Sequence, residues 1–196
     1  MKMEEKHKLI WKMALLFQDY REDKGHAEIT LNFAQKLLKS EKADPDIVIP
    51  AIILHDVGWS QLSETDYLLL RPGADPKEER KVRIKHQKEG VKVAKIILTA
   101  ARYDKNLADL LLEIISQHDT RKKSISKEDA VTRDADKLWQ YSKIGFRADL
   151  RRKEICPRGQ YEYLKKSINQ KEFLFTESAK VIARKELEQR RKEFEL

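Results

Sequence analysis

Residues 51–58 read Ala51-Ile52-Ile53-Leu54-His55-Asp56-Val57-Gly58. This segment places an imidazole and a carboxylate side by side at the end of an apolar helical run. Burying such a pair without polar partners is expensive. The partners must therefore come from elsewhere in the chain, and the candidates are His26 upstream and His86, His118 and the Asp134-Ala135-Asp136 cluster downstream.

The apolar residues around this segment recur at helical spacing, and alternating β-type patterns bounded by turn residues are few. We therefore predict an all-α protein. The helices are expected over about 4–20, 27–41, 45–56, 77–101, 105–118, 127–142, 144–154, 159–169 and 172–193. Asp44-Pro45 is a helix-start signal, with aspartate as N-cap and proline at the first helical position. Residues 57–76 form the longest expected loop, and a long loop that starts at the His-Asp pair is often functional.

A chain of 196 residues can bury one substantial core, whereas two full domains would be cramped. We predict a single helical domain over 1–196, in which a metal-binding core of about 20–150 is followed by a C-terminal helical extension of about 151–196. The single cysteine, Cys156, excludes an intramolecular disulfide and a thiolate zinc site. A reducing cytoplasm fits this composition. The apolar run near the N-terminus is too short and too charged for a signal sequence or a membrane span.

The net charge of +8 is concentrated at the C-terminal end, because residues 151–196 hold 13 Lys and Arg against 8 Glu. Mixed Lys/Glu runs of this kind are typical of a solvated helix face. Nucleic-acid binding would need a denser basic patch and a recognition motif, so it is disfavoured. The apolar residues of the extension are expected to pack on the domain or on a second subunit, and the sequence leaves a homo-oligomer open.

The candidate site residues lie on or beside apolar helix faces. Leu111, Ile114 and Ile115 lead to His118 with i, i+3, i+4, i+7 spacing, so His118 ends an apolar stripe. The same count favours Asp134 over Asp136 as the inward carboxylate. A single histidine in such a position is more often a hydrogen-bonded core or helix-end residue than a ligand. Five or six such residues together favour a metal site.

Neutral imidazoles combined with carboxylates suit Mn²⁺, Fe²⁺, Co²⁺, Ni²⁺ or Zn²⁺, whereas an all-oxygen site would suit Mg²⁺ or Ca²⁺. The implied cofactor is therefore a divalent transition metal, as one ion or two.

His26, His55-Asp56 and the aspartate within Ala135-Asp136-Lys137-Leu138 resemble the H…HD…D signature of the HD-domain metal-dependent phosphohydrolase superfamily. The resemblance spans about residues 20–150. It implies an HD-type helical bundle, and it points to Asp136, not Asp134, as the last metal ligand. We favour the motif over the face count, because a helix phase taken from sequence is easily wrong by one position.

His86 and His118 stand where HD-domain members with two-metal centres, including HD-GYP phosphodiesterases and symmetrical dinucleoside tetraphosphatases, place ligands of the second metal. Residues 131–146 are also similar to an HD subgroup with nucleotide pyrophosphohydrolase activity. Two departures matter. Trp59 stands where many members have a lysine after His-Asp-x-Gly, and the GYP signature is absent.

The resemblance implies a phosphohydrolase that acts on a nucleotide or a related phosphate ester or anhydride through a metal-activated water. The metal ligands would be His26, His55, Asp56, His86, His118 and Asp136, with Asp56 bridging two ions. Asp119 would orient a histidine or the water, although an exposed aspartate at a helix end is an equally good interpretation. Lys137 would contact substrate phosphate, although a single lysine of this kind is more often a surface cation. The partner would be a phosphorylated small molecule. The alternative is a nucleotide-sensing HD module with weak catalysis, which Trp59 favours.

Overall fold

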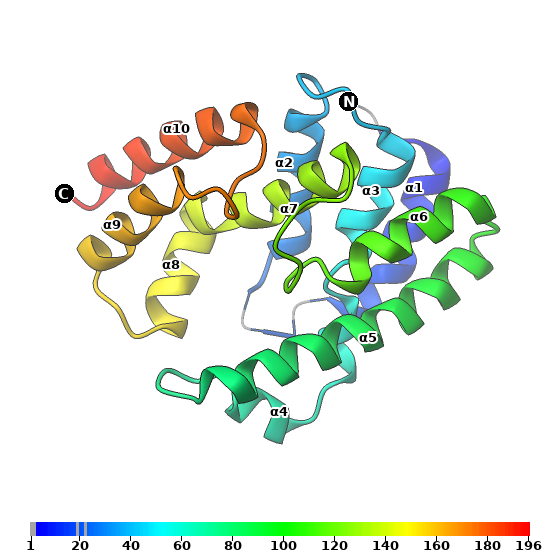
Figure 1. Cartoon of the computed structure of the whole chain (residues 1–196), viewed down its shortest axis with the longest axis horizontal. Coiled ribbons are helices and arrows are strands. Elements are labelled where there is room, and N and C mark those ends of the chain that lie inside the picture. The colour runs from blue at the N-terminus through cyan, green and yellow to red at the C-terminus, as the bar shows by residue number, and fades with distance from the viewer. Residues whose placement is uncertain (1–2, 19, 22) are drawn as a thin grey trace.

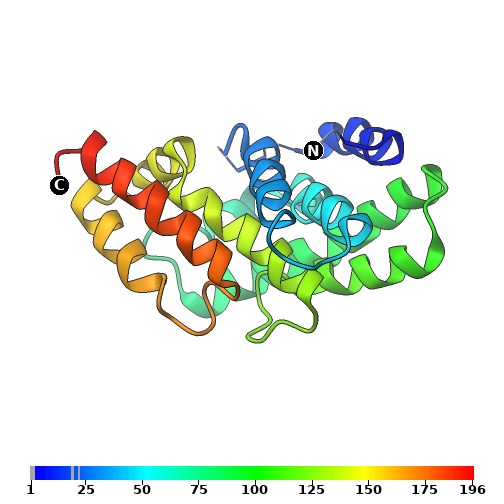
Figure 2. The same ribbon diagram turned by 90° about the horizontal axis from the view of Figure 1, so that it is seen from above.

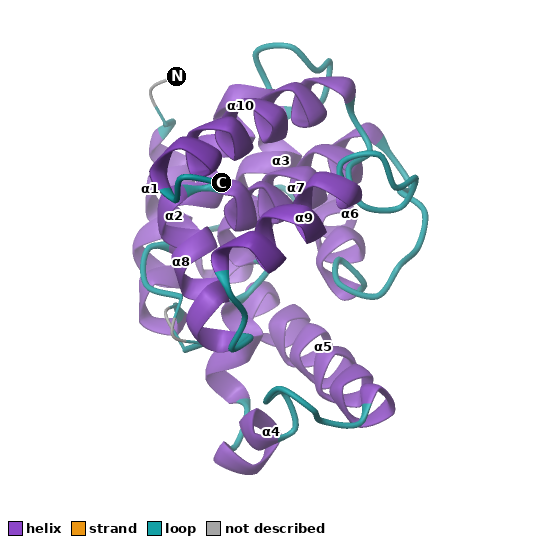
Figure 3. Ribbon diagram, turned by 90° about the vertical axis from the view of Figure 1, so that its left-hand side faces the viewer, coloured by secondary structure: helices purple, strands orange, loops and turns teal. Residues whose placement is uncertain are grey.

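A computed structural model describes residues 3–18, 20–21 and 23–196. About 70% of the chain is helical, and the described residues contain no strand, as Figure 3 shows. The predicted all-α class is confirmed. The α-helices are α1 (Glu5–Ala14), α2 (His26–Leu37), α3 (Pro45–Leu54), α4 (Glu64–Leu68), α5 (Pro76–Ala100), α6 (Lys105–Ser116), α7 (Lys127–Leu138), α8 (Lys143–Arg152), α9 (Pro157–Ser167) and α10 (Glu177–Glu193). Short 3₁₀ helices are η1 (Leu15–Phe17), η2 (Val57–Gln61) and η3 (Trp139–Tyr141).

Helix α3 lies at the centre of the fold, where it packs against α1, α2, α6 and α7 (Figure 1). Every residue from Ile47 to Leu54 is buried, so the helix is apolar on all sides. Its start follows the predicted signal: the Asp44 side chain accepts a hydrogen bond from the Asp46 amide at 2.8 Å, and Pro45 is the first helical residue. Helix α3 thereby delivers His55 and Asp56 directly from the core.

A proline inside α3 leaves one backbone carbonyl without its helical partner. Pro50 has no N–H, so it cannot bond the carbonyl of Asp46 four residues earlier. The Tyr103 hydroxyl donates a hydrogen bond to that oxygen at 2.6 Å. The connection between α5 and α6, which carries Tyr103, is thus attached to the first turn of the central helix.

Two glycines allow η2 to cross α5 at close range. A Cβ atom added at Gly58 would lie 2.1 Å from the His86 carbonyl oxygen and 2.4 Å from the Gly90 nitrogen. Any larger residue at position 58 would therefore clash with backbone. This crossing brings the middle of the long helix α5, and with it His86, beside the His55-Asp56 turn.

The prediction of one long loop over residues 57–76 is wrong, because this segment contains η2 and α4. Helix α4 begins at a capping box in which Ser63 and Asp66 exchange hydrogen bonds between side chain and backbone. Ser-x-x-Asp is a recognisable start signal that the proline and glycine residues nearby had obscured. The irregular part is confined to the segment from the end of α4 to Pro76.

Helices α8, α9 and α10 gather at one end of the elongated molecule, and the α5–α6 pair extends toward the other (Figure 2). Apolar residues at the α8–α10 end belong to the same buried cluster as α3, including Leu164 of α9, Leu187 of α10, and Ile168 and Leu174 between these two helices. The expected boundary near residue 150 falls within α8, and the division of the chain into core and extension stays a prediction. In the described part of the chain, no helix combines the length and the apolar composition that crossing a membrane requires.

Candidate metal centre

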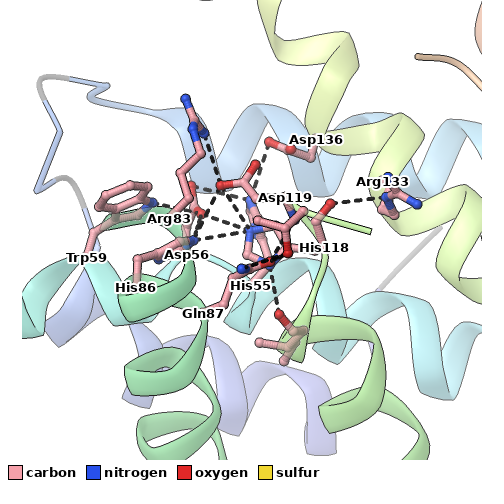
Figure 4. Close-up of polar contacts among 12 residues, drawn as sticks. His55, Asp56, Trp59, Arg83, His86, Gln87, His118, Asp119, Arg133 and Asp136 are labelled. Carbon is pink, nitrogen blue, oxygen red and sulfur yellow. Dashed lines mark hydrogen bonds and ion pairs between the residues drawn. The ribbon is translucent and has the colours of Figure 1, made fainter. Parts of the chain in front are cut away.

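Five helices and their ends bring the candidate residues together (Figure 4). His26 is the first residue of α2 and follows Gly25, whose φ of 84° is the left-handed conformation that glycine adopts without strain. His55 and Asp56 end α3, and His118 and Asp119 follow α6. His86 lies within α5 and Asp136 within α7.

One cluster joins His26, His55, Asp56 and Asp136. The two Nε2 atoms of the histidines lie 3.1 Å apart, and Asp56 Oδ2 lies 3.3 Å from the first and 3.4 Å from the second. Asp136 Oδ1 lies 3.4 Å from His26 Nε2 and 3.5 Å from His55 Nε2. Donors held about 2.1 Å from a common ion lie roughly 3.0 Å apart in an octahedral site and roughly 3.4 Å apart in a tetrahedral one. The donor atoms of His26, His55 and Asp56 therefore have the spacing of ligands around one metal ion, and Asp136 Oδ1 lies at a similar distance from both histidines.

A second cluster consists of His86, His118 and Asp56, and Asp56 also belongs to the first cluster. The Asp56 Oδ1 atom lies 3.5 Å from the Nε2 atom of His86 and 3.5 Å from that of His118, and these two Nε2 atoms are 3.3 Å apart. Asp119 Oδ2 is farther away, at 3.7 Å from His86 and 4.0 Å from His118. The two oxygens of Asp56 thus face different histidine pairs, which is the arrangement of a bridging carboxylate.

Two of the four histidine rings, those of His55 and His118, are oriented by main-chain carbonyls. His55 Nδ1 contacts the Ile52 carbonyl at 2.8 Å, and His118 Nδ1 contacts the Ile115 carbonyl at 2.9 Å. A hydrogen on each Nδ1 satisfies these contacts and leaves the Nε2 lone pair directed into the cluster. This is the tautomer that a metal ligand needs.

The pKa values in the first cluster reflect a charged network. Burial acts to lower the pKa of His55, but the charge of Asp56 and the hydrogen bond to Asp136 outweigh it and raise the pKa to about 10. Burial acts to raise the pKa of Asp56, but the charge of His55 and the hydrogen bond from His118 hold it well below its usual range. Burial also acts to raise the pKa of Asp136, but the hydrogen bonds from His26 and His55 outweigh burial and hold this pKa well below its usual range. Without a metal, a proton on His55 balances the carboxylates.

The second cluster differs because, at His86, burial outweighs the charges of Asp56 and Asp119. Burial lowers the pKa of His86 to about 3, so its ring is neutral near pH 7. The Trp59 indole stacks on that ring, with centroids 3.9 Å apart and planes at 10°, and Trp59 Nε1 donates a hydrogen bond to Asp56 Oδ1 at 3.0 Å. Trp59 therefore contacts two members of the second cluster, His86 and Asp56, a role that the sequence argument did not predict.

Asp119 is held by a charged partner that the sequence argument also missed. Arg83 Nη1 donates to Asp119 Oδ2 at 3.1 Å, and the Asp119 amide donates to Gln87 Oε1 at 3.1 Å. Burial acts to raise the pKa of Asp119, but the charge of Arg83 outweighs burial and holds this pKa well below its usual range. Asp119 Oδ2 is nearest to the Nε2 atoms of His86 and His118, which also face Asp56, so it lies on the same side of these rings as the shared carboxylate. Arg83 and Gln87 lie on α5, close in sequence to His86. This closeness is the one feature of the sequence that could have identified them as partners of Asp119.

Asp134 is as deeply buried as the helical-face count required, but it faces away from the histidines. It accepts hydrogen bonds from the amides of Phe175 and Thr176, each at 2.8 Å, and from the Thr176 hydroxyl at 2.7 Å. Thr176 is in turn the N-cap of α10. The face count therefore identified an inward carboxylate that contacts the C-terminal helix, whereas Asp136 joins the histidines.

The basic residues near the cluster separate into two groups. Arg133 donates to the main-chain oxygens of His118, at 3.1 Å, and of Arg121, so it holds the turn after α6 and does not face the open site. Lys137 lines a cavity of about 350 Å³ beside the cluster, together with Arg21 and Arg152. Burial and the like charges of Arg152 and Arg83 lower the pKa of Arg21, which stays cationic.

A sequence model of the HD domain family matches residues 24–139, more than half of the chain, and the chain belongs to this family. The predicted membership is thereby confirmed. Proteins of this family are mostly metal-dependent phosphohydrolases. No curated protein and no solved structure matches the chain significantly.

Proposed function

We propose that this protein is a metal-dependent phosphohydrolase that hydrolyses a phosphate ester or anhydride of a nucleotide. The observation that carries the proposal is the pair of clusters that share Asp56, with donor separations of 3.1–3.5 Å in the first and 3.3–3.5 Å in the second. HD membership supports the same class of reaction.

The donor set fits divalent transition metals. His26, His55, Asp56 and Asp136 would hold one ion, and His86, His118 and Asp56 a second. Neutral imidazole and carboxylate together suit Mn²⁺, Fe²⁺, Co²⁺, Ni²⁺ or Zn²⁺. A bound divalent ion would lower the pKa of a coordinated water toward neutrality and neutralise charge on the phosphoryl group.

The remaining groups bind and orient the reactants. Lys137 lines the cavity, and it forms no salt bridge with any described residue, so its ammonium is available to a phosphate oxygen. Asp119, which Arg83 holds through a salt bridge, would accept a hydrogen bond from the attacking water. In the reaction, the water oxygen forms a bond to phosphorus, the bond from phosphorus to the leaving oxygen breaks, and that oxygen keeps the electron pair and is protonated.

A nucleotide-sensing module with little turnover is the second candidate. It is favoured by Trp59, which stands where many HD proteins have a lysine and which contributes an indole that stacks on His86 instead of a cation. A sensor would bind nucleotide tightly without releasing product.

Product analysis distinguishes the two candidates. The wild type is incubated with Mn²⁺ and nucleoside mono-, di- and triphosphates, dinucleoside polyphosphates and cyclic nucleotides, and the products are separated by chromatography. Asp56→Asn should abolish turnover, whereas Asp109→Asn, an equal change of charge on the exposed face of α6, should not. If no compound is consumed by wild type with metal bound, while calorimetry detects nucleotide binding, the sensor replaces the hydrolase.

A further inference from the structure

A second and larger cavity, of about 740 Å³, adjoins the metal centre. Its walls come from residues 20–21, from α4 and the segment that follows it, and from the end of α8. We call it the arginine cavity, after Arg21, Arg71, Arg151 and Arg152 in its lining. Its volume lies within the usual range of small-molecule sites, roughly 300–1,000 Å³.

The arginine cavity lies next to the metal centre. Arg21 and Arg152 line both this cavity and the one beside the metal ligands. A further cavity of about 270 Å³ is lined by the same two arginines. The Arg21 guanidinium lies 4.1 Å from the Trp59 ring centroid, and Trp59 bonds Asp56. Arg21 thus belongs both to the arginine cavity and to the surroundings of the metal ligands.

Among the described residues that line the arginine cavity, the positive charges outnumber the negative ones. Four guanidinium groups face two carboxylates, those of Glu64 and Glu154. Arg21, Arg71 and Arg151 form no salt bridge with any residue that the structure describes, and Arg152 shares Asp149 with Lys153. Guanidinium groups form paired hydrogen bonds with phosphate oxygens, so unpaired arginines around one cavity are suited to an anion of several charges.

We propose, on the basis of the phosphohydrolase function above, that the arginine cavity binds the part of the substrate beyond the cleaved phosphoryl group and that this part itself carries phosphate. The preferred substrates are then compounds with two or more linked phosphates, and phosphate monoesters are poor ones. Tyr20, Tyr67 and Leu70 supply a wall with apolar surface for the organic portion of the leaving group.

The inference is tested by measuring how inorganic tripolyphosphate binds to the metal-free protein in the presence of EDTA. Without metal the protein cannot hydrolyse the probe, and the probe cannot act by chelating the catalytic metal. Calorimetry should show one site that binds tripolyphosphate at least tenfold more tightly than orthophosphate. The double variant Arg71→Ala/Arg151→Ala should weaken tripolyphosphate binding by roughly tenfold or more, because each lost contact is a charge-assisted hydrogen bond. Both side chains are exposed and unpaired, so the fold should persist.

The matched control is Arg158→Ala/Arg184→Ala, which removes the same charge from exposed positions on α9 and α10. It should change tripolyphosphate affinity by less than about twofold, since distant surface charges are screened at physiological salt. Glu64→Gln should strengthen binding, because it removes a carboxylate from the cavity wall. Equal weakening by the two double variants, or no preference for tripolyphosphate over orthophosphate, would overturn the inference.

These outcomes are independent of catalysis. If wild type hydrolyses no phosphate compound but Arg71→Ala/Arg151→Ala loses tripolyphosphate binding, the arginine cavity stands and the hydrolase proposal fails. If wild type hydrolyses nucleotides and the double variant leaves kcat/KM for di- and triphosphates unchanged, the hydrolase stands and the arginine cavity does not select the substrate.

Discussion

The Trp59 indole lies flat on the His86 imidazole, with ring centroids 3.9 Å apart. The same indole donates its N–H to Asp56 Oδ1, the oxygen that faces His86 and His118. One side chain therefore orients both a histidine and the shared carboxylate.

Trp59→Phe should keep the stacking on His86 but remove the hydrogen bond to Asp56. Loss of a partner behind a metal ligand typically lowers metal affinity by roughly 10- to 100-fold. We expect a decrease of that size at the second cluster, measured by Mn²⁺ or Zn²⁺ titration calorimetry, with the first cluster much less affected. Trp11→Phe, on α1 and remote from the site, is the control. Unchanged affinity at both sites would show that the indole N–H does not orient Asp56.

Asp134 and Asp136 form a matched pair for mutation. Asp136→Asn should lose the ion of the first cluster while the helical circular dichroism signal is retained, since Asp136 Oδ1 lies beside His26 and His55. Asp134→Asn should retain metal and instead lower the free energy of unfolding by about 1–3 kcal/mol, because an amide cannot accept all three hydrogen bonds from Phe175 and Thr176. Elemental analysis and urea unfolding of both variants check the pair, and the opposite pattern would exchange the roles of the two aspartates.

Asp134 also predicts a pH dependence of stability. Burial raises its pKa to about 6, against the hydrogen bonds from Phe175 and Thr176, which lower it. Since the folded-state pKa lies above the unfolded value of about 3.9, the contribution of this group is complete below about pH 4 and is lost as the pH rises through about 6. The difference in unfolding free energy between wild type and Asp134→Asn should decrease by up to about 3 kcal/mol from pH 4 to pH 7. A difference that grows with pH would mean that the hydrogen bonds outweigh burial.

Metal binding should release a proton from His55. In the metal-free protein the pKa of His55 is raised to about 10, so the ring is protonated near pH 8, whereas a metal ligand needs a free Nε2. We expect about one proton to be released for each ion bound at the first cluster, and an affinity that rises with pH up to about 10. Calorimetry in two buffers with different ionisation enthalpies measures the proton count. Metal binding without proton release would show that His55 is neutral in the metal-free protein.

Single alanine variants should separate the two clusters. His86→Ala and His118→Ala each remove a ligand of the second cluster only, so the bound metal should fall by half, while His26→Ala should affect the first cluster. Elemental analysis after dialysis against a chosen metal provides the stoichiometry. The same metal content in wild type, His86→Ala and His118→Ala would reduce the centre to a single ion.

Local sequence signals accounted for most helices. Asp44-Pro45 marked the start of α3, and the spacing of apolar residues placed α5, α6 and α7 within a few residues of their bounds. Helix α4 was missed because its capping box stands among proline and glycine residues that indicate loops. These features are local, since a cap or an apolar stripe depends on residues within one or two turns.

The sequence by itself determined the helical class, the HD membership and the residue types able to hold a metal. Only the tertiary structure decided how these residues meet. Periodicity showed that Asp134 is inward, but whether an inward carboxylate meets His26 or Thr176 depends on which helix packs against α7. Likewise, the close contact between Gly58 and the backbone of α5 brings His86 beside Asp56. The packing of α4 and α8 near Arg21 forms the walls of the arginine cavity. Contacts between residues distant in the chain are selected by packing of the whole core, and no short segment encodes them.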